Sequence, residues 1–474
     1  MAAYPPIFHV NRRMIPQPIP MTAKPNDLSE RVKLTVFVLA IAFLAFVAGG
    51  ITTFLKWPPV EVFMQRTAMV ALYLYKSNVD ENLLDPFWHA SHLPGPESEN
   101  PVILHDATAA WQGLNLFVTT GVQGATLMDM DGKVVHEWRL RFDEAWDTAP
   151  HVKSYAEHDP AYWADKVYWR RVHLFPNGDL LVLFESPYRT PYGFGLAKLD
   201  KDSKVIWKLS ENAHHDTAIG PHGEIYVLTQ SISERGYPGL PRINPPFIDD
   251  KVTILSADGE KRKEISILAA FLASGYEPLL DTLSEDLLGD IMHVNAVQYV
   301  DAATAALYPI AEEGQLLISM REINAIALLD PEAERIVWAD TGMWRRQHEP
   351  QMLENGRILL FDNQGHRGRE GESRVIEYDP ATGAVAWSYA GTAKEPLISR
   401  VYGSQQRLAN GNTLIVESNN GRAIEVTPEG RTVWEFRLAE RTESGGTEMV
   451  RILPNLVRIG PDGLTFLEQA SAGR

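Results

Sequence analysis

A two-part sequence pattern recurs along the chain from about residue 112 and restricts the folds open to it. Its most regular part is an apolar stretch, a turn with Asp, Pro or Gly, and a second apolar stretch that often ends in Trp. Six copies occur, at 125–138, 195–207, 251–265, 325–338, 374–387 and 422–434. Trp338 and Trp387 are 49 positions apart, and Trp387 and Trp434 are 47 apart. The chain therefore repeats one structural unit.

Each copy is preceded by further strand signals. A turn glycine and an apolar strand come before it, as in Asn355-Gly356 followed by RILLFDN, and one more strand precedes that turn. Four short strands in a repeat of about 45–50 residues are typical of a β-propeller blade. The sequence thus predicts an all-β fold, a six-bladed β-propeller with four-stranded blades over residues 106–474. A β-sandwich or two smaller sheets are the alternatives, which six copies in phase disfavour.

The two ends of the repeat region complement each other. The first copy lacks its leading strand, and the segment 448–455 has that strand's pattern with no blade after it. We therefore expect the C-terminal strand to complete the first blade and to close the ring, which would remove the exposed strand edges.

An uncharged run of 22 residues, 34–55, precedes the repeats. About 20 apolar residues in a helix span a bilayer core, so this run predicts a transmembrane helix, with a cleaved signal peptide and a buried core helix as alternatives. The tail 1–33 carries five basic and two acidic residues, a net charge of +3. By the positive-inside rule the N-terminus is cytoplasmic. We expect a single-pass protein of the inner membrane with a periplasmic propeller.

The segment between helix and repeats, 56–105, is expected to be a connector. Apolar residues at helical spacing within 57–77 predict a short amphipathic helix, and the Pro- and His-rich stretch 85–104 reads as irregular.

Composition removes several classes of chemistry. The chain has no cysteine, which excludes disulfides, thiolate metal ligands and a cysteine nucleophile. A net charge of −17 argues against nucleic acid as a partner. No phosphate-binding glycine motif is present. We expect neither a metal nor an organic cofactor.

Three histidines occupy comparable places in successive repeats. His215 and His348 each lie eight positions before a turn glycine, and His293 has the same role in the repeat between them, with Asn295 two residues further on. Strand alternation should keep His293 and Asn295 on one face. Residues of one repeat register converge around a propeller channel, so these side chains predict a site at its mouth. Arg321, which ends the strand LLISMR, could hold an anionic group there.

These segments resemble the bacterial arylsulfotransferase family, whose members are six-bladed periplasmic propellers. The resemblance is carried by GATLMDMDGKVVHEW, AHHDTAIGPHGEIYVL, HVNAVQY with LISMRE, QHEPQMLENGRILLFDNQGHRGR and QRLANGNTLIVES. It implies that His348 is a nucleophile, that His293, Asn295 and Arg321 hold a sulfuryl group, and that His215 is a further active-site residue. The implied reaction moves a sulfuryl group from an aryl sulfate ester to a phenol through a sulfohistidine, without a nucleotide donor.

Two other classes remain open. The segment 379–387, DPATGAVAW, looks like the tryptophan-docking repeat of quinoprotein propellers. The anchor and the connector would also suit a non-catalytic subunit or scaffold of an envelope membrane complex, which would make a membrane protein the partner.

Overall fold

The computed structural model describes residues 27–54, 86–149, 159–240, 243, 245–282, 289–365, 372–444, 446–460 and 463–467. The chain divides into two units, Met1–Asn82 and Leu83–Arg474.

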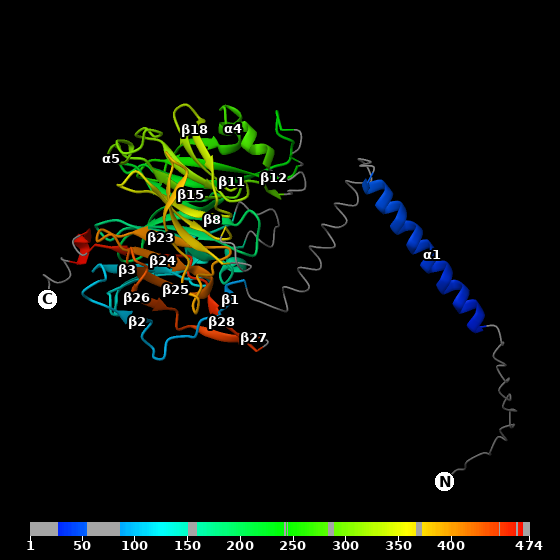
Figure 1. Ribbon diagram of the computed structural model, residues 1–474, viewed down its shortest axis with the longest axis horizontal. Coiled ribbons are helices and arrows are strands. Elements are labelled where there is room, and N and C mark those ends of the chain that lie inside the picture. The colour runs from blue at the N-terminus through cyan, green and yellow to red at the C-terminus, as the bar shows by residue number, and fades with distance from the viewer. Residues whose placement is uncertain are drawn as a thin grey trace, which may run out of the picture. The chain divides into compact units, whose positions relative to one another are not determined.

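In the first unit, the described residues form helix α1 (Asp27–Phe54), which runs through most of the predicted anchor (Figure 1). Its apolar side chains include the exposed Phe37, Phe43 and Phe46. Within the part of the chain that the structure describes, we find no helix with the combined length and hydropathy for crossing a membrane. The amphipathic helix predicted within 57–77 lies outside the described residues.

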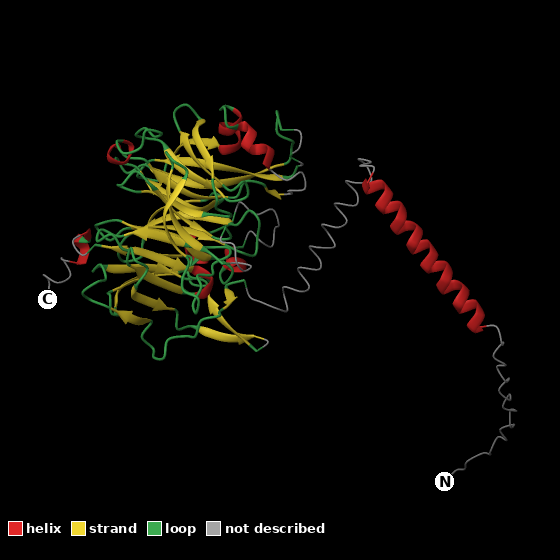
Figure 2. Cartoon of the chain, in the orientation of Figure 1, coloured by secondary structure: helices red, strands yellow, loops and turns green. Residues whose placement is uncertain are grey.

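The second unit is built from antiparallel strands with a few short helices (Figure 2). In the described residues, six of its sheets contain four strands in antiparallel succession. In chain order these sheets are β29-β3-β4-β5 (Asn455–Ile459, Leu114–Val118, Gly124–Met128, Val134–Arg139), β6 to β9 (Tyr168–Leu174, Leu180–Glu185, Gly193–Leu199, Val205–Leu209), β10 to β13 (Ala213–Ile219, Ile225–Ser233, Phe247–Leu255, Lys261–Ser266), β15 to β18 (Val294–Tyr299, Leu316–Met320, Ala325–Asp330, Arg335–Thr341), β19 to β22 (His348–Met352, Ile358–Asp362, Arg374–Asp379, Ala384–Tyr389) and β23 to β26 (Ser404–Arg407, Thr413–Glu417, Arg422–Val426, Thr432–Arg437).

The remaining elements are short. Strand β14 (Gly289–Asp290) pairs in parallel with β12, and the helices among the described residues of this unit have six residues or fewer. They are α3 (Phe142–Ala145), η2 (Pro160–Trp163), α4 (Ile267–Leu272), η3 (Glu277–Thr282), α5 (Ala302–Ala305) and η4 (Ser418–Asn420).

All six copies of the sequence pattern form antiparallel hairpins, from β4-β5 to β25-β26. Four of the recurring tryptophans link one sheet to the next, because their indole nitrogens donate to carbonyls in a turn of the following sheet. The pairs are Trp138 to Gly178, Trp207 to Ala257, Trp387 to Pro428 and Trp434 to Met130. Trp434 thus joins the last sheet of the chain to the first.

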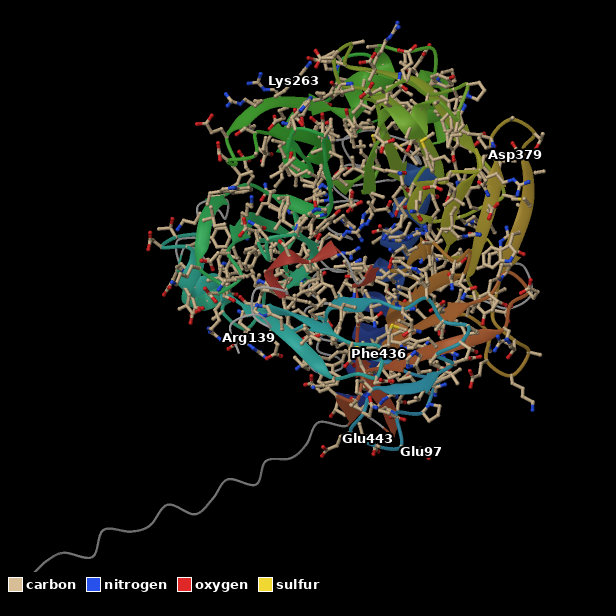
Figure 3. All side chains as sticks on the ribbon, turned by 90° about the vertical axis from the view of Figure 1, so that its left-hand side faces the viewer. Glu97, Arg139, Lys263, Asp379, Phe436 and Glu443 are labelled. Atoms are coloured by element: carbon tan, nitrogen blue, oxygen red, sulfur yellow. The ribbon has the colours of Figure 1, made fainter. Side chains whose placement is uncertain are left out.

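The apolar core lies between neighbouring sheets. Trp138 and Phe184 belong to a cluster between the first two sheets, and corresponding clusters join each later pair. One cluster contains both Trp434 and Leu456, so it packs the last sheet against the first. Figure 3 shows the sheets set around a common centre. The unit is all-β, mainly antiparallel and propeller-like.

The predicted bounds of the closing strand were partly wrong. Segment 448–455 falls mainly in β28 (Thr447–Arg451), which turns back on β27 (Arg441–Ser444) around Gly446 at φ +78°. The strand that pairs with β3 is β29, after Pro454. Glycine accepts that positive φ, and a hairpin forms where the pattern suggested a blade strand.

The connector prediction was also wrong near its end. Residues Val102–His105 form strand β2, which pairs with the outer strand β26, and Trp88–Ala90 form β1, which pairs with β28. Strand β2 covers an edge that β26 would otherwise expose.

Candidate active site

The innermost strands of four consecutive sheets bulge at their ends. Register shifts occur in β6, β10, β15 and β19. His215, His293 and Glu349 have positive φ values of 54°, 52° and 49° there. A bulge redirects side chains, and strained backbone of this kind gathers at functional sites.

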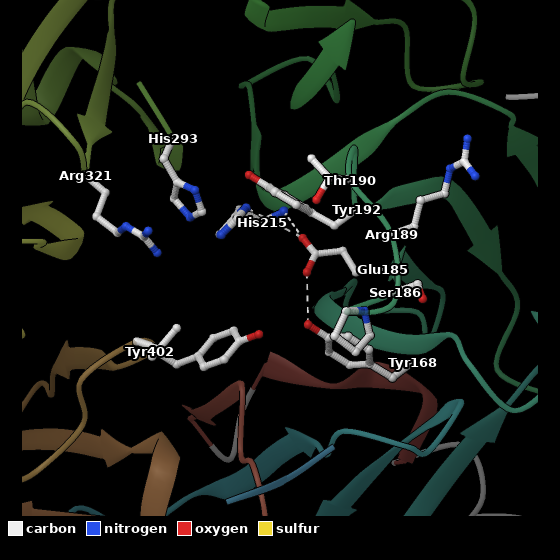
Figure 4. A pocket seen from close by; sticks show the side chains of 12 residues that line it. Tyr168, Glu185, Ser186, Arg189, Thr190, Tyr192, His215, His293, Arg321 and Tyr402 are labelled. Atoms are coloured by element: carbon white, nitrogen blue, oxygen red, sulfur yellow. Dashed lines mark hydrogen bonds and ion pairs between the residues drawn. The ribbon is translucent and has the colours of Figure 1, made fainter. Parts of the chain in front are cut away.

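A cavity of about 150 Å³ opens beside these bulges. In Figure 4, His215, His293 and Arg321 border one space together with the rings of Tyr402 and Tyr168. Its lining consists of Tyr168, Glu185, Ser186, Pro187, Arg189, Thr190, Tyr192, His215, His293, Arg321, Val401 and Tyr402. Three of the five predicted site residues therefore line one cavity.

His348 is buried and lies outside that lining, yet its electrostatic partners include Arg321 and His293. Its Nδ1 lies 2.7 Å from Asn363 Oδ1 and 3.1 Å from the carbonyl of Arg346. Both contacts are to acceptors, so Nδ1 carries the proton and Nε2 keeps its lone pair. Nε2 is buried with no hydrogen-bond partner among the described residues.

The charge of His348 is set by its surroundings. Burial lowers its pKa well below 6.5, and the positive charges of Arg321 and Arg170 add to that effect, although Asn363 opposes it. The imidazole is therefore neutral, the form in which it is a nucleophile.

His293 forms an ion pair or hydrogen bond through Nδ1 with Asp290. Burial opposes ionisation of Asp290, but His293 outweighs it and lowers the pKa of that carboxyl. An ionised Asp290 accepts the proton that His293 carries on Nδ1. The rings of His293 and His215 meet edge to face, with centroids 4.9 Å apart.

His215 is held on two sides. Its backbone N–H donates to Glu185 Oε1 at 2.5 Å, and its Nδ1 lies 3.0 Å from Nδ1 of His214. Burial, followed by the charges of His293 and Arg170, lowers its pKa well below 6.5. Burial also raises the pKa of Glu185.

Arg321 reaches the cavity while bound to its neighbour Glu322. Its Nε and Nη2 donate to Glu322 Oε1 at 3.0 and 2.6 Å. Arg346 donates to the other oxygen at 3.3 Å. Two arginines thus share one carboxylate, which leaves a net positive charge beside the cavity.

Asn295 does not stay beside His293. A register shift between Val294 and Ala296 breaks the expected alternation. Asn295 is buried, and its Nδ2 donates to the carbonyl of Gln347 at 2.8 Å. It therefore supports the strand that carries His348 and is not part of the cavity lining.

Sequence reasoning missed several residues of the site, although a repeat signal was present. Glu185, Gln230, Arg321 and Asn363 each lie seven positions after a turn glycine. Arg170 lies eight positions before Gly178, the register of His215 and His348. Arg170 was missed because only histidines were considered at that position of the repeat. It stacks on Tyr402, with 4.9 Å between the guanidinium carbon and the ring centre.

Potential metal ligands do not gather into a group of three or more in the described part of the chain. The site is a small buried cavity that brings together histidines, an arginine and tyrosines at the centre of a propeller-like fold.

The protein belongs to the arylsulfotransferase (ASST) family, whose sequence model matches residues 171–439, more than half of the chain. The matched region contains His215, His293, Arg321 and His348. Membership supports an arylsulfotransferase-like function in general terms.

Solved structures with a similar arrangement are distant. A Bacteroides caccae protein of unknown function shares 12% identity over 72% of this chain and 99% of its own, with a TM-score of 0.43. A WD40 β-propeller domain shares 10% identity (79% and 97% covered, TM-score 0.39), and a streptogramin B lyase shares 11% (78% and 97%, TM-score 0.39). No curated protein sequence matches the chain.

Proposed function

We propose that the protein transfers a sulfuryl group from an aryl sulfate ester to a phenol through a sulfohistidine on His348. The observation that carries the proposal is the buried Nε2 of His348, which keeps a free lone pair because Nδ1 donates to Asn363. A neutral imidazole is a competent nucleophile towards an activated ester.

Two balanced steps make up the reaction. In the first, Nε2 of His348 bonds to sulfur, the bond from sulfur to the aryl oxygen breaks, and the leaving phenolate takes a proton from protonated His293. In the second, the acceptor phenol gives its proton to His293, its oxygen bonds to sulfur, and the N–S bond breaks. Asp290 supports this acid–base role because its contact with Nδ1 orients the ring of His293.

Arg321 and His215 have electrostatic roles in this proposal. The sulfuryl oxygens carry negative charge throughout the transfer, and preorganised donors stabilise that charge in the transition state. Arg321 supplies a cation, and His215 supplies a neutral N–H group. No metal or nucleotide takes part in either step.

The size of the cavity supports a ping-pong order. Its volume of about 150 Å³ is below the ~300–1,000 Å³ of common ligand pockets. Such a space suits one small aromatic group at a time, so the first phenol would leave before the acceptor enters.

The test is mass spectrometry of the full chain, in detergent, after incubation with a chromogenic aryl sulfate and no acceptor. We expect the His348 peptide to gain one SO₃ group and later addition of phenol to remove it. His348→Asn should lose the modification, whereas the matched control His222→Asn, at an exposed turn, should keep it. Equal turnover by the wild type and His348→Asn would remove His348 from the mechanism.

A non-catalytic propeller subunit is the second candidate. It is favoured by one observation, the attachment of Arg321 to Glu322, which occupies the Nε and Nη2 donors of the guanidinium. Folded wild-type protein without transfer across a broad panel of aryl sulfates, purified with stoichiometric membrane partners, would support this candidate.

We further propose that the six four-stranded sheets are the blades of one closed ring. The tryptophan bonds and the core cluster between the last and first sheets support this count.

For location, we propose that residues 34–55 anchor the chain in the inner membrane with the propeller in the periplasm. The uncharged run and the basic tail support this topology. A reporter fused after Arg474 that is active in the cytoplasm alone would contradict it.

A further inference from the structure

His214 is a buried histidine next to the site that the proposed reaction does not use. It lies on β10 directly before His215, is fully buried and is not part of the cavity lining. Its Nδ1 is 3.0 Å from Nδ1 of His215, and its Nε2 is 3.5 Å from Oδ1 of Asp250 on β12. These two contacts connect Asp250, through His214, to His215, which lines the cavity.

Two neighbouring carboxyl groups, those of Asp250 and Asp290, disfavour each other's ionisation. Asp250 is buried, Asp290 is half-buried, and the two interact electrostatically. Burial and the charge of Asp290 raise the pKa of Asp250 well above its usual range, whereas His293 keeps Asp290 ionised. Asp250 is therefore the carboxyl that retains a proton.

The proton of Asp250 has one acceptor among its described contacts. Gln230 Nε2 donates to Oδ1 at 3.1 Å and the backbone N–H of Val294 donates to Oδ2 at 3.2 Å, so both contacts deliver protons to Asp250. His214 Nε2 is buried with no hydrogen-bond partner and faces Oδ1. Among these contacts, His214 Nε2, at 3.5 Å from Oδ1, is the one able to accept a proton from Asp250.

The proton positions on His214 and His215 follow from the chemistry of imidazole. A neutral ring carries one N–H, so when Nε2 of His214 accepts, Nδ1 donates. That proton goes to Nδ1 of His215, which forces the N–H of His215 onto Nε2. Burial lowers the pKa of His214 to about 3, which keeps this ring neutral.

We propose that His214 and Asp250 are positioning residues that fix His215 as an Nε2–H donor towards the cavity. The order is Asp250 O–H to His214 Nε2, His214 Nδ1–H to His215 Nδ1, and His215 Nε2–H to an oxygen of the bound sulfuryl group. The inference deepens the proposed function and rests on it for the identity of the ligand.

The other groups that face His215 leave this arrangement intact. Glu185 Oε1 is 3.7 Å from Nδ1 of His215, beyond hydrogen-bond distance, and already accepts the backbone N–H of His215. The other oxygen of Glu185 accepts from Tyr168. Arg170, His293 and His348 disfavour a positive charge on His215.

The first test reads the tautomer of His215 without turnover. In the full chain labelled at histidine nitrogens and held in detergent, NMR shifts distinguish a protonated from an unprotonated Nε2, with His215→Ala providing the assignment. We expect a protonated Nε2 in the wild type and a mixture of tautomers in Asp250→Leu. An unprotonated Nε2 in the wild type overturns the inference, whether or not the protein transfers sulfate.

The second test is a double-mutant cycle on release of the chromogenic phenol in the first half-reaction. His214→Phe should slow release by about 10- to 100-fold, the range found when a residue that orients a metal-bound histidine is replaced. In a His215→Ala background the same change should have little further effect. Equal losses in both backgrounds would mean that His214 acts independently of His215, and would overturn the proposal.

Two further variants separate positioning from stability. Asp250→Asn can still donate to His214 and should recover most of the rate that Asp250→Leu loses. The matched control is Asp249→Asn on the same strand, whose carboxyl binds Ser266, and it should keep the wild-type rate. Wild-type protein that shows the expected tautomer but no transfer would count against the proposed function and leave this inference standing.

Discussion

Asn363 and His348 form a hydrogen bond whose direction is determined by two main-chain carbonyls. Asn363 Nδ2 donates to the carbonyls of Ser399 at 2.6 Å and Tyr402 at 2.8 Å. Its Oδ1 must therefore be the atom that faces His348 Nδ1 at 2.7 Å. The loop at 399–402 thus dictates, through one amide, which nitrogen of His348 is free to react.

Replacing Asn363 should separate positioning from simple loss of stability. Asn363→Leu removes the acceptor for Nδ1–H, so we expect the first half-reaction to slow by about 10- to 100-fold. The two carbonyls lose their donor, which should cost about 1–3 kcal/mol of unfolding free energy. Stopped-flow phenol release and urea unfolding measure the two effects. The control Gln364→Leu, at a half-buried neighbour, should change neither. An unchanged half-reaction in Asn363→Leu would contradict the role of the amide.

An arginine and two carboxylates join the inner strands behind the site. Arg171 binds Asp216 at 2.9 Å and Glu349 at 2.7 and 3.0 Å, and all three side chains are largely buried. Arg171→Leu leaves two buried carboxylates without a cation, so unfolding free energy should fall by about 3–5 kcal/mol. Urea denaturation measures it.

The same experiment needs two comparisons. Arg171→Leu combined with Glu349→Leu should recover part of the loss, because one uncompensated carboxylate is removed. Arg139→Leu breaks an exposed pair with Glu137 and should cost no more than about 1 kcal/mol. A similar small loss for Arg171→Leu would show that the buried cluster contributes little.

Acid should destabilise the fold through its buried histidines. Burial lowers the pKa of His214 to about 3 and the pKa of His348 well below 6.5. Between those values and 6.5 the unfolded chain binds protons that the folded chain does not, so stability falls as pH drops below about 6.5. Thermal unfolding between pH 7 and pH 4 should show this decrease, and His348→Asn should make it shallower.

Two buried glutamates have the opposite effect on the pH dependence of stability. Burial raises the pKa of Glu349 and of Glu417 to about 7. A raised carboxyl pKa contributes stability that is lost as pH rises from about 4.5 through 7. Glu417→Gln should therefore reduce the loss of stability that occurs as pH rises towards 7. A profile that is equally steep below pH 6.5 in wild type and His348→Asn would contradict the assignment to that histidine.

Strand β29 should be essential to the sheet unit. Deleting residues 455–474 removes the partner of β3 and the buried Leu456, so the protein should aggregate or lose cooperative unfolding. Deleting residues 468–474 removes none of the described strands and serves as the control. Circular dichroism during heating distinguishes them. A cooperative transition at the wild-type temperature in the longer deletion would show that β29 is dispensable.

The local sequence pattern was enough to predict the hairpins and part of the site. Six apolar pairs around short turns became six antiparallel hairpins, because strand alternation and turn glycines act over a few residues. The register that placed His215 and His348 eight positions before a turn glycine also brought them near one cavity. That register also contained Arg170, and a second register, seven positions after the turn glycine, contained Glu185 and Asn363. A wider search of the repeat would have found all three.

Tertiary structure decided what depends on contacts between sheets. Bulges separated Asn295 from His293, although alternation placed them together, because a bulge shifts the register by one residue. Strand β2 pairs with the edge of β26, although its stretch was expected to be irregular. The predicted closing segment is divided between two sheets, because β28 ends before Pro454 and β29 begins after it. The reactive nitrogen of His348 depends on carbonyls more than 50 residues away along the chain, since Ser399 and Tyr402 orient Asn363. A repeat in sequence predicts which residues share a register, but hydrogen-bond direction and charge at the site arise from side chains that meet only when the sheets pack.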